Sequence, residues 1–99
     1  MRALMLRMRG YEVHAVADLT EARFRLNEEK YHLVIVDVGH FAESGLEFCE
    51  EIKKQQPDLK VLMQAEDRVF PIANRCPDRV IPKQDGPHTF ILEVERVLA

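Results

Sequence analysis

The sequence predicts an α/β domain with a doubly wound parallel sheet, on the strength of three observations. Short runs rich in β-branched residues alternate along the chain with segments of helical periodicity. The chain has 99 residues, of which 46% are hydrophobic, and this is enough for a single core. Neither an internal repeat nor a low-complexity segment interrupts this order. We therefore expect residues 1–99 to form one domain whose strands are joined by helices.

The chain opens with a predicted helix and a predicted strand. Apolar residues at helical spacing (i, i+3, i+4, i+7) would form the buried stripe of a helix that ends at Gly10. The stripe consists of Met1, Leu4, Met5 and Met8. Residues 11–16 (YEVHAV) then predict a short strand.

A second helix is predicted from its N-terminal signal. Asp18 offers a capping oxygen and Glu21 stands three residues later, which is the arrangement of a capping box. The helix would run to about Glu29. Its buried face would carry Leu19, Ala22 and Leu26.

Two buried strands flank the next predicted helix. Residues 33–36 (LVIV) are continuously apolar and mostly β-branched, which is typical of a strand covered on both faces of a parallel sheet. Helical spacing returns over residues 44–56 and ends before Pro57. Residues 59–64 (LKVLMQ) predict the second buried strand.

The C-terminal part predicts a short strand and a closing helix. Residues 79–81 (RVI) lie between Pro77 and Pro82 and predict a third buried strand. The closing helix has an apolar inner face of Phe90, Ile91, Val94, Val97 and Leu98. Residues 66–77 are expected to hold little more than one helical turn or an irregular loop, because Pro71 and Pro77 interrupt them.

Composition excludes several classes of function. The net charge is −3, and no basic stripe of the kind that a nucleic-acid partner requires is present. No apolar run is long enough to span a membrane, and no signal-peptide core follows the N-terminal arginines. Cys49 and Cys76 form no CxxC pair, so we expect a reducing, cytoplasmic setting. Cys49 shares a helical face with Leu46 and Ile52 and is expected to be a core thiol.

Polar side chains follow the three buried strands. Asp37 ends the first strand, Gln64 ends the second, and Lys83 lies just past the third. Ligands of open α/β sheets bind outside the carboxyl ends of the strands. A carboxylate and an ammonium group at that edge form a candidate site for the transfer of an anionic group.

The spacing around these residues resembles a known family. Residues 33–38 (LVIVDV) precede a polar, Gly-containing loop that returns to a helix after Gly45. Residues 45–63 (GLEFCEEIKKQQPDLKVLM) and 80–83 (VIPK) continue the match over nearly the whole chain. In these motifs the chain resembles the receiver domain of bacterial two-component response regulators. The resemblance implies a flavodoxin-like sheet that here lacks the family's first, central strand, so that four strands are left.

The resemblance also implies a chemistry and its partners. Asp37 would accept a phosphoryl group from a histidine kinase or a phosphotransfer protein, giving an aspartyl phosphate. Lys83 would contact one phosphoryl oxygen, and Mg²⁺ would bridge another, with Asp37 and the backbone carbonyl of Gly39 among its ligands. The chain would then be a signalling phosphoprotein in a phosphorelay rather than an enzyme.

The chain departs from the family in the residues around the phosphoacceptor. The pair of acids that holds Mg²⁺ in receivers is missing, and Glu66 or Asp67 could lend a carboxylate. An ungapped match puts Ala65 at the family's Ser/Thr position, and a slip of one residue would put Gln64 there. Three further positions differ from the family's usual residue: Phe41 for a loop proline, Val80 for an aromatic, and Gln84 for the proline after the lysine.

These departures leave two further hypotheses open. The chain could be a degenerate receiver that acts as a phosphorylation-independent protein-interaction or dimerisation module, with a homodimer as one outcome. Without the central strand, residues 11–16 and 33–37 would pair directly, leave a gap, or recruit a strand from another chain. A hydrolase that uses Asp37 as its nucleophile would need a general base, which the sequence does not show.

Overall fold

The computed structural model describes residues 2–39, 42–65 and 77–99 of the chain. It separates into two compact units, Met1–Lys30 and Tyr31–Ala99, which we take one at a time. Among the described residues, no helix is both long enough and apolar enough to cross a membrane.

The first unit contains the helices α1 (Arg2–Met8) and α2 (Leu19–Glu28), and both of its predicted helix-end signals are confirmed. Gly10 has a φ of 92°, and the N–H groups of Gly10 and Tyr11 donate to the carbonyls of Arg7 and Leu6 at 3.0 and 3.1 Å, respectively, which is a Schellman ending. At the start of α2, the Asp18 carboxylate accepts a hydrogen bond from the Glu21 N–H at 2.8 Å.

The buried faces predicted for these two helices are only partly right. On α1, Leu4 and Met8 are 57% and 78% exposed, whereas Leu6, which is not on the predicted stripe, is buried. Met1 lies outside the described residues. On α2, Leu19, Ala22 and Leu26 are half-buried, and no residue of the helix is fully buried. Periodicity located the less exposed side of α2 but overstated how deeply it is buried.

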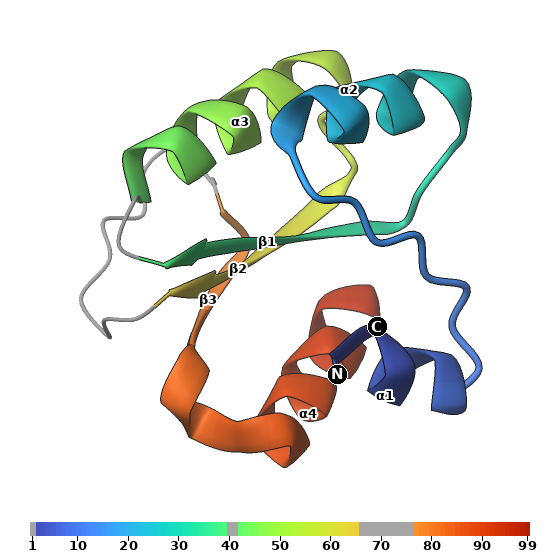
Figure 1. The fold of residues 1–99 in the computed structure, drawn as a ribbon, viewed down its shortest axis with the longest axis vertical. Helices are drawn as coiled ribbons and strands as arrows, with labels where there is room; N and C mark the ends of the chain where they lie inside the picture. The colour runs from blue at the N-terminus through green and yellow to red at the C-terminus, as the bar shows by residue number, and fades with distance from the viewer. Residues whose placement is uncertain (1, 40–41, 66–76) are drawn as a thin grey trace. The chain divides into compact units, whose positions relative to one another are not determined.

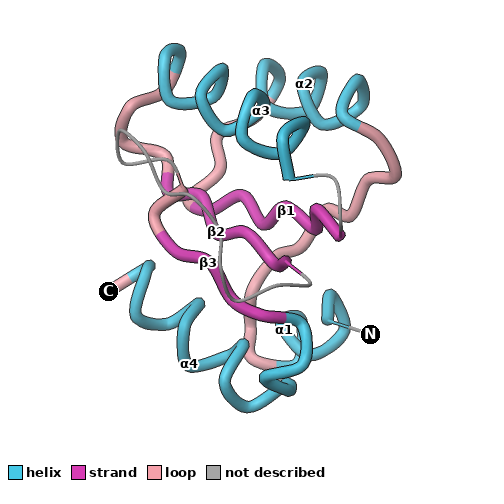
Figure 2. The backbone as a smooth tube through the Cα atoms, turned by 90° about the vertical axis from the view of Figure 1, so that its left-hand side faces the viewer, coloured by secondary structure: helices cyan, strands magenta, loops and turns pink. Residues whose placement is uncertain are grey.

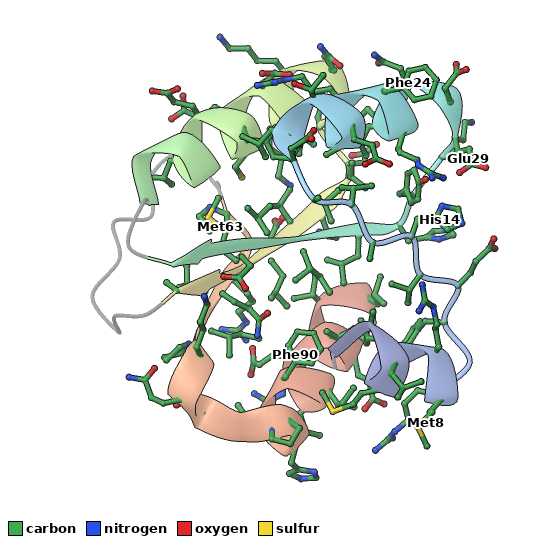
Figure 3. The ribbon with its side chains drawn as sticks, in the orientation of Figure 1. Met8, His14, Phe24, Glu29, Met63 and Phe90 are labelled. Atoms are coloured by element: carbon green, nitrogen blue, oxygen red, sulfur yellow. The ribbon has the colours of Figure 1, made fainter. Side chains whose placement is uncertain are left out.

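The predicted strand over residues 11–16 is wrong, because this segment is irregular. The Arg7 guanidinium donates to the Val13 carbonyl at 2.9 Å, so this backbone oxygen is bonded to a side chain and not to a strand. His14 Nδ1 lies 3.2 Å from Glu29 Oε2, and Figure 3 shows the two side chains next to each other. A strand needs a neighbour for its backbone groups. No strand of the described residues pairs with this segment.

The second unit is a parallel sheet between two helices, as Figures 1 and 2 show. Its strands have the order β1-β2-β3 and are all parallel. In chain order its elements are β1 (Leu33–Gly39), α3 (Ala42–Gln55), β2 (Lys60–Ala65), β3 (Arg79–Pro82), the short 3₁₀-helix η1 (Lys83–Asp85) and α4 (Gly86–Leu98). Helix α3 covers one face and α4 the other, so the doubly wound class is confirmed. The described residues contain three strands where four were expected.

The two faces of this sheet carry different rows of side chains. Met63 of β2 points to the α3 side, and Phe90 of α4 points toward the opposite face (Figure 3). Because side chains alternate along a strand, Leu62 and Gln64 belong to the α4 face. All five residues of β2 after Lys60 are buried. Strand β2 is therefore the centre of the core.

Both helices bury the apolar stripes that their periodicity predicts. Helix α3 buries Phe48, Cys49 and Ile52, and α4 buries Phe90, Ile91 and Val94, while Val97 and Leu98 are half-buried. Cys49 is 0% exposed, as expected of a core residue. Its sulfur is disulfide-bonded, however, so the predicted free thiol is wrong. The expectation of a reducing setting depended on unpaired cysteines, so this disulfide bond no longer supports it.

A cluster of polar contacts joins α3, β2 and the start of β3 at the amino end of the sheet. Lys53 Nζ donates to the Leu59 carbonyl at 2.7 Å and to Asp78 Oδ2 at 2.8 Å. The same Asp78 oxygen accepts the Val61 N–H at 2.7 Å, and the Asp78 N–H donates to the Val61 carbonyl at 2.9 Å. We call this group of residues the amino-end cluster; it fixes β2 and β3 side by side.

The amino-end cluster predicts how stability depends on pH. Burial by itself raises the pKa of Asp78, but the hydrogen bonds from Lys53 and Val61 and the positive charges of Lys53 and Lys60 together outweigh it, so the pKa is lowered from its ordinary value of 3.8. A carboxyl whose pKa is lower in the folded state than in the unfolded one stabilises the fold fully above the unfolded value. This stabilisation is lost as the pH falls through the folded value.

We therefore expect the free energy of unfolding to decrease below about pH 4, measured by urea denaturation at a series of pH values. The Asp78→Asn variant should show a weaker decrease over the same range. Equal slopes for the variant and the parent chain would show that Asp78 does not carry the effect.

Candidate functional site

The three polar residues predicted to follow the strands lie at the same edge of the sheet. Asp37 of β1 is the Cα partner of Gln64 of β2, and Gln64 is the partner of Ile81 of β3. Lys83 begins η1 directly after β3. Since all three strands are parallel, their carboxyl ends meet here, and the predicted convergence is confirmed.

Asp37 and Lys83 form an ion pair across this edge. Lys83 Nζ lies 2.5 Å from Asp37 Oδ1. The Asp37 side chain is 62% exposed and the Lys83 side chain 27% exposed, so the carboxylate is open to solvent while the ammonium group is half-buried beside it. Because β2 lies between β1 and β3, the ion pair passes over the carboxyl end of β2. An exposed carboxylate next to a fixed positive charge can act as a nucleophile toward an anionic group.

The end of β1 is irregular at the candidate site. The register runs from the pair Asp37–Gln64 directly to the pair Gly39–Ala65, so β1 has one extra residue there, a β-bulge. A bulge bends the strand and redirects the side chain beside it. The extra residue is Val38, so Asp37 is the last residue of β1 before the bulge and keeps the regular register with β2, and Gly39 stays at the same edge.

The residues at this edge supply only part of a metal site. In the described residues, no group of three His, Cys, Asp or Glu side chains could hold a metal ion. The oxygen donors that the resemblance implies are the Asp37 carboxylate and the Gly39 carbonyl, both at this edge; Glu66 and Asp67 lie outside the described residues. Mg²⁺ usually keeps several waters and is held by one or two carboxylates together with substrate phosphates. These donors therefore fit a Mg²⁺ that is held jointly with a phosphoryl group.

The other positions at which the chain differs from the usual receiver residues lie in different parts of the second unit. Ala65 is 2% exposed and pairs with Gly39 and Pro82, so the residue at the carboxyl end of β2 has no polar side chain. Val80 pairs with Met63 inside the sheet, and Gln84 is exposed on η1. Phe41 lies outside the described residues.

Gln64 has a property that its place in the sequence does not predict. It is 3% exposed, and its Nε2 has no hydrogen-bond partner among the described residues. The one available signal was a polar residue inside the apolar run of β2 (KVLMQA). Sequence alone does not reveal whether such a residue is satisfied, because its partners come from other elements.

These features define a flavodoxin-like α/β domain with an acidic residue and a lysine at the carboxyl edge of its sheet. The chain belongs to the response regulator receiver domain family, whose model matches residues 1–89. Receiver domains work in two-component signalling, are generally phosphoryl-accepting modules rather than enzymes, and typically bind Mg²⁺. The two-component response regulator PhoP of Pseudomonas aeruginosa is 30% identical over 77 residues, which cover 73% of this chain and 34% of PhoP. The chain thus spans about a third of that relative's length.

Solved receiver structures resemble the whole of this chain. TrrA of Thermotoga maritima, determined in complex with Mg²⁺ and BeF, has a TM-score of 0.82 and 25% identity, with 98% of this chain and 89% of TrrA covered. The orphan response regulator HP1043 of H. pylori has a TM-score of 0.80 and 18% identity, with 99% and 84% covered. Because its sequence identity is 18%, the similarity to HP1043 supports the fold and not a shared function.

Proposed function

We propose that this chain is a receiver module of a phosphorelay in which Asp37 accepts a phosphoryl group from a histidine kinase or a phosphotransfer protein. The observation that carries the proposal is the Asp37–Lys83 ion pair, 2.5 Å long, at the carboxyl edge of the sheet. It supplies a solvent-exposed nucleophile and a positive charge within reach of the same phosphoryl oxygens.

The transfer needs little from the protein beyond positioning and charge. An Asp37 carboxylate oxygen attacks the phosphorus of the donor's phosphohistidine, the P–N bond breaks, and the electron pair returns to the imidazole nitrogen, which takes a proton from water. The product is an acyl phosphate on Asp37. Lys83, which binds the carboxylate before transfer, is placed to bind a phosphoryl oxygen after it. A Mg²⁺ held by Asp37 and the Gly39 carbonyl would add a second positive charge at the phosphoryl oxygens.

The proposal is tested by incubating the chain with acetyl phosphate and MgCl₂ and measuring its intact mass. We expect a gain equal to one phosphoryl group, which hydroxylamine removes because it cleaves acyl phosphates. A receiver domain with a complete acidic pair serves as the positive control. A chain that stays unlabelled while this control is labelled would refute phosphoryl transfer to it.

Replacing Lys83 by Met is expected to slow labelling by acetyl phosphate roughly 10- to 100-fold, because the variant keeps the nucleophile but loses the charge beside it. The rate is followed by intact mass over time. Lys54→Met, which removes an exposed lysine of α3, is the matched control and should label at the parent rate. An unchanged rate in Lys83→Met would assign that lysine to stability and not to transfer.

The alternative function is a protein-interaction or dimerisation module that does not use phosphorylation. Two observations favour it: Ala65 offers no hydroxyl at the end of β2, and among the described residues β1 is hydrogen-bonded to a neighbour on one side only. The labelling experiment decides between the two functions. If labelling fails, light scattering at several protein concentrations tests whether a homodimer forms.

A further inference from the structure

We infer that Gln64 is a positioning residue whose side-chain amide donates a hydrogen bond to the phosphoryl group carried by Asp37. This inference rests on the proposed function and adds to it a neutral donor at the same edge of the sheet. Three features of the second unit support it: the register of β2, the burial of Gln64, and the path of the Asp37–Lys83 ion pair.

The register places Gln64 next to Asp37. The two residues are Cα partners in adjacent parallel strands, so their side chains leave the same face of the sheet. That face is the one covered by α4, because Met63, the preceding residue, points to α3 (Figure 3). Lys83 reaches Asp37 from η1, which directly precedes α4. The ion pair and Gln64 therefore belong to one end of the same face.

Burial leaves the Gln64 amide with an unused donor. Gln64 is 3% exposed, and its Nε2 has no partner in the part of the chain that the structure describes. A buried amide without a hydrogen bond is unfavourable, whereas an apolar side chain of similar volume is not. Its neighbours Leu62, Met63 and Ala65 are apolar and buried, so nothing in β2 itself compensates the amide.

A phosphoryl group on Asp37 would bring an acceptor to this donor. Adjacent strands lie about 4.8 Å apart, and glutamine has three rotatable side-chain bonds, so its amide can follow the group on the neighbouring strand. Phosphoryl oxygens are strong, charged acceptors, and a hydrogen bond to a charged partner is stronger than a neutral one. Since Ala65 cannot donate through its side chain, Gln64 is the side chain at the carboxyl end of β2 that can.

In this arrangement two residues, Lys83 and Gln64, contact the phosphoryl group. Lys83, which is half-buried, is the charged contact, and Gln64, which is buried, is the neutral contact. Occupancy of Asp37 would satisfy a donor that lies between the sheet and α4. The presence of the phosphoryl group is thereby linked to the packing of that layer.

The experiment compares the parent chain with Gln64→Met, which has a similar volume and no donor, and uses beryllofluoride with MgCl₂ as the phosphoryl mimic. Thermal melting over a series of beryllofluoride concentrations gives an apparent dissociation constant. We expect the value for Gln64→Met to be about tenfold larger than for the parent chain. The variant without beryllofluoride should melt at the same temperature as the parent chain or higher. Gln55→Met, at the exposed end of α3, is the matched control and should bind like the parent chain.

A spectroscopic measurement separates positioning from a structural role. In ¹⁵N–¹H spectra, the side-chain NH₂ signals that disappear in Gln64→Met belong to Gln64, and they should shift downfield when beryllofluoride is added to the parent chain. Equal dissociation constants together with unshifted signals would overturn the inference while leaving the proposed function intact. If the parent chain neither takes the phosphoryl group nor binds beryllofluoride, the proposed function fails and the inference fails with it. If Gln64→Met does not fold, Gln64→Leu gives the same comparison.

Discussion

Replacing Asp37 by Asn is expected to abolish labelling of the chain by acetyl phosphate. The variant keeps the size and shape of the side chain but replaces the nucleophilic oxygen by an amide, which does not form an acyl phosphate. The fold should be retained, because the Asp37 side chain is 62% exposed and its pair with Lys83 is partly open to solvent. Intact mass after incubation measures the loss, and circular dichroism checks the fold.

The matched control for this substitution is Asp58→Asn, which changes an exposed aspartate at the opposite end of the sheet. It should be labelled to the same extent as the parent chain. Labelling of Asp37→Asn at the parent stoichiometry would mean that another residue accepts the group, and the assignment of the phosphoacceptor would then be wrong.

Replacing Asp78 by Ala is expected to lower the free energy of unfolding by about 2 kcal/mol. The variant removes the acceptor shared by Lys53 and Val61 at 2.8 and 2.7 Å, respectively. It leaves a half-buried ammonium group, 17% exposed, without its carboxylate. Urea denaturation at pH 7 measures the change. Asp58→Ala, which lies on the surface near the same end of β2, should change the stability by less than about 0.5 kcal/mol. A similar small change in Asp78→Ala would show that the amino-end cluster does not hold β2 and β3 together.

The second unit could be predicted from the sequence because its elements carry strong local signals. The buried run of β2 and the stripes of α3 and α4 each indicate both an element and its burial. The continuous apolar run of β1 indicates the strand but overstates its burial, because, of residues 33–36, Val36 alone is buried and the other three are half-buried. The positions of Asp37 and Lys83 then follow from a general property of parallel sheets, whose carboxyl ends share one edge. Their ion pair is the geometric outcome of that property.

The sequence-based predictions that differ from the structure have a common physical origin. Each concerns a feature that depends on contacts with residues of other elements. Residues 11–16 alternate like a strand, but alternation does not supply the neighbour that a strand requires. The apolar spacing of α1 does not specify which side of the helix is covered by other residues, and Leu6 is buried in place of Leu4. The unsatisfied amide of Gln64 is likewise a matter of what surrounds it. The roles of Asp37, Lys83 and Gly39 stay predictions, which the labelling experiments test.

The parallel order of the three strands also bears on how the chain folds. Each pairing joins strands separated by a long connection, and no pair of strands is linked by a tight hairpin. The entropy of closing these long loops is lost before the sheet gains its contacts, so we expect slower folding than in a helical bundle of the same size. Until both neighbours have docked, β2 exposes a backbone and a set of apolar side chains that are fully covered in the final fold. Aggregation during refolding should therefore begin at β2. Conditions that speed the docking of β1 and β3 on β2 should improve the yield of soluble protein.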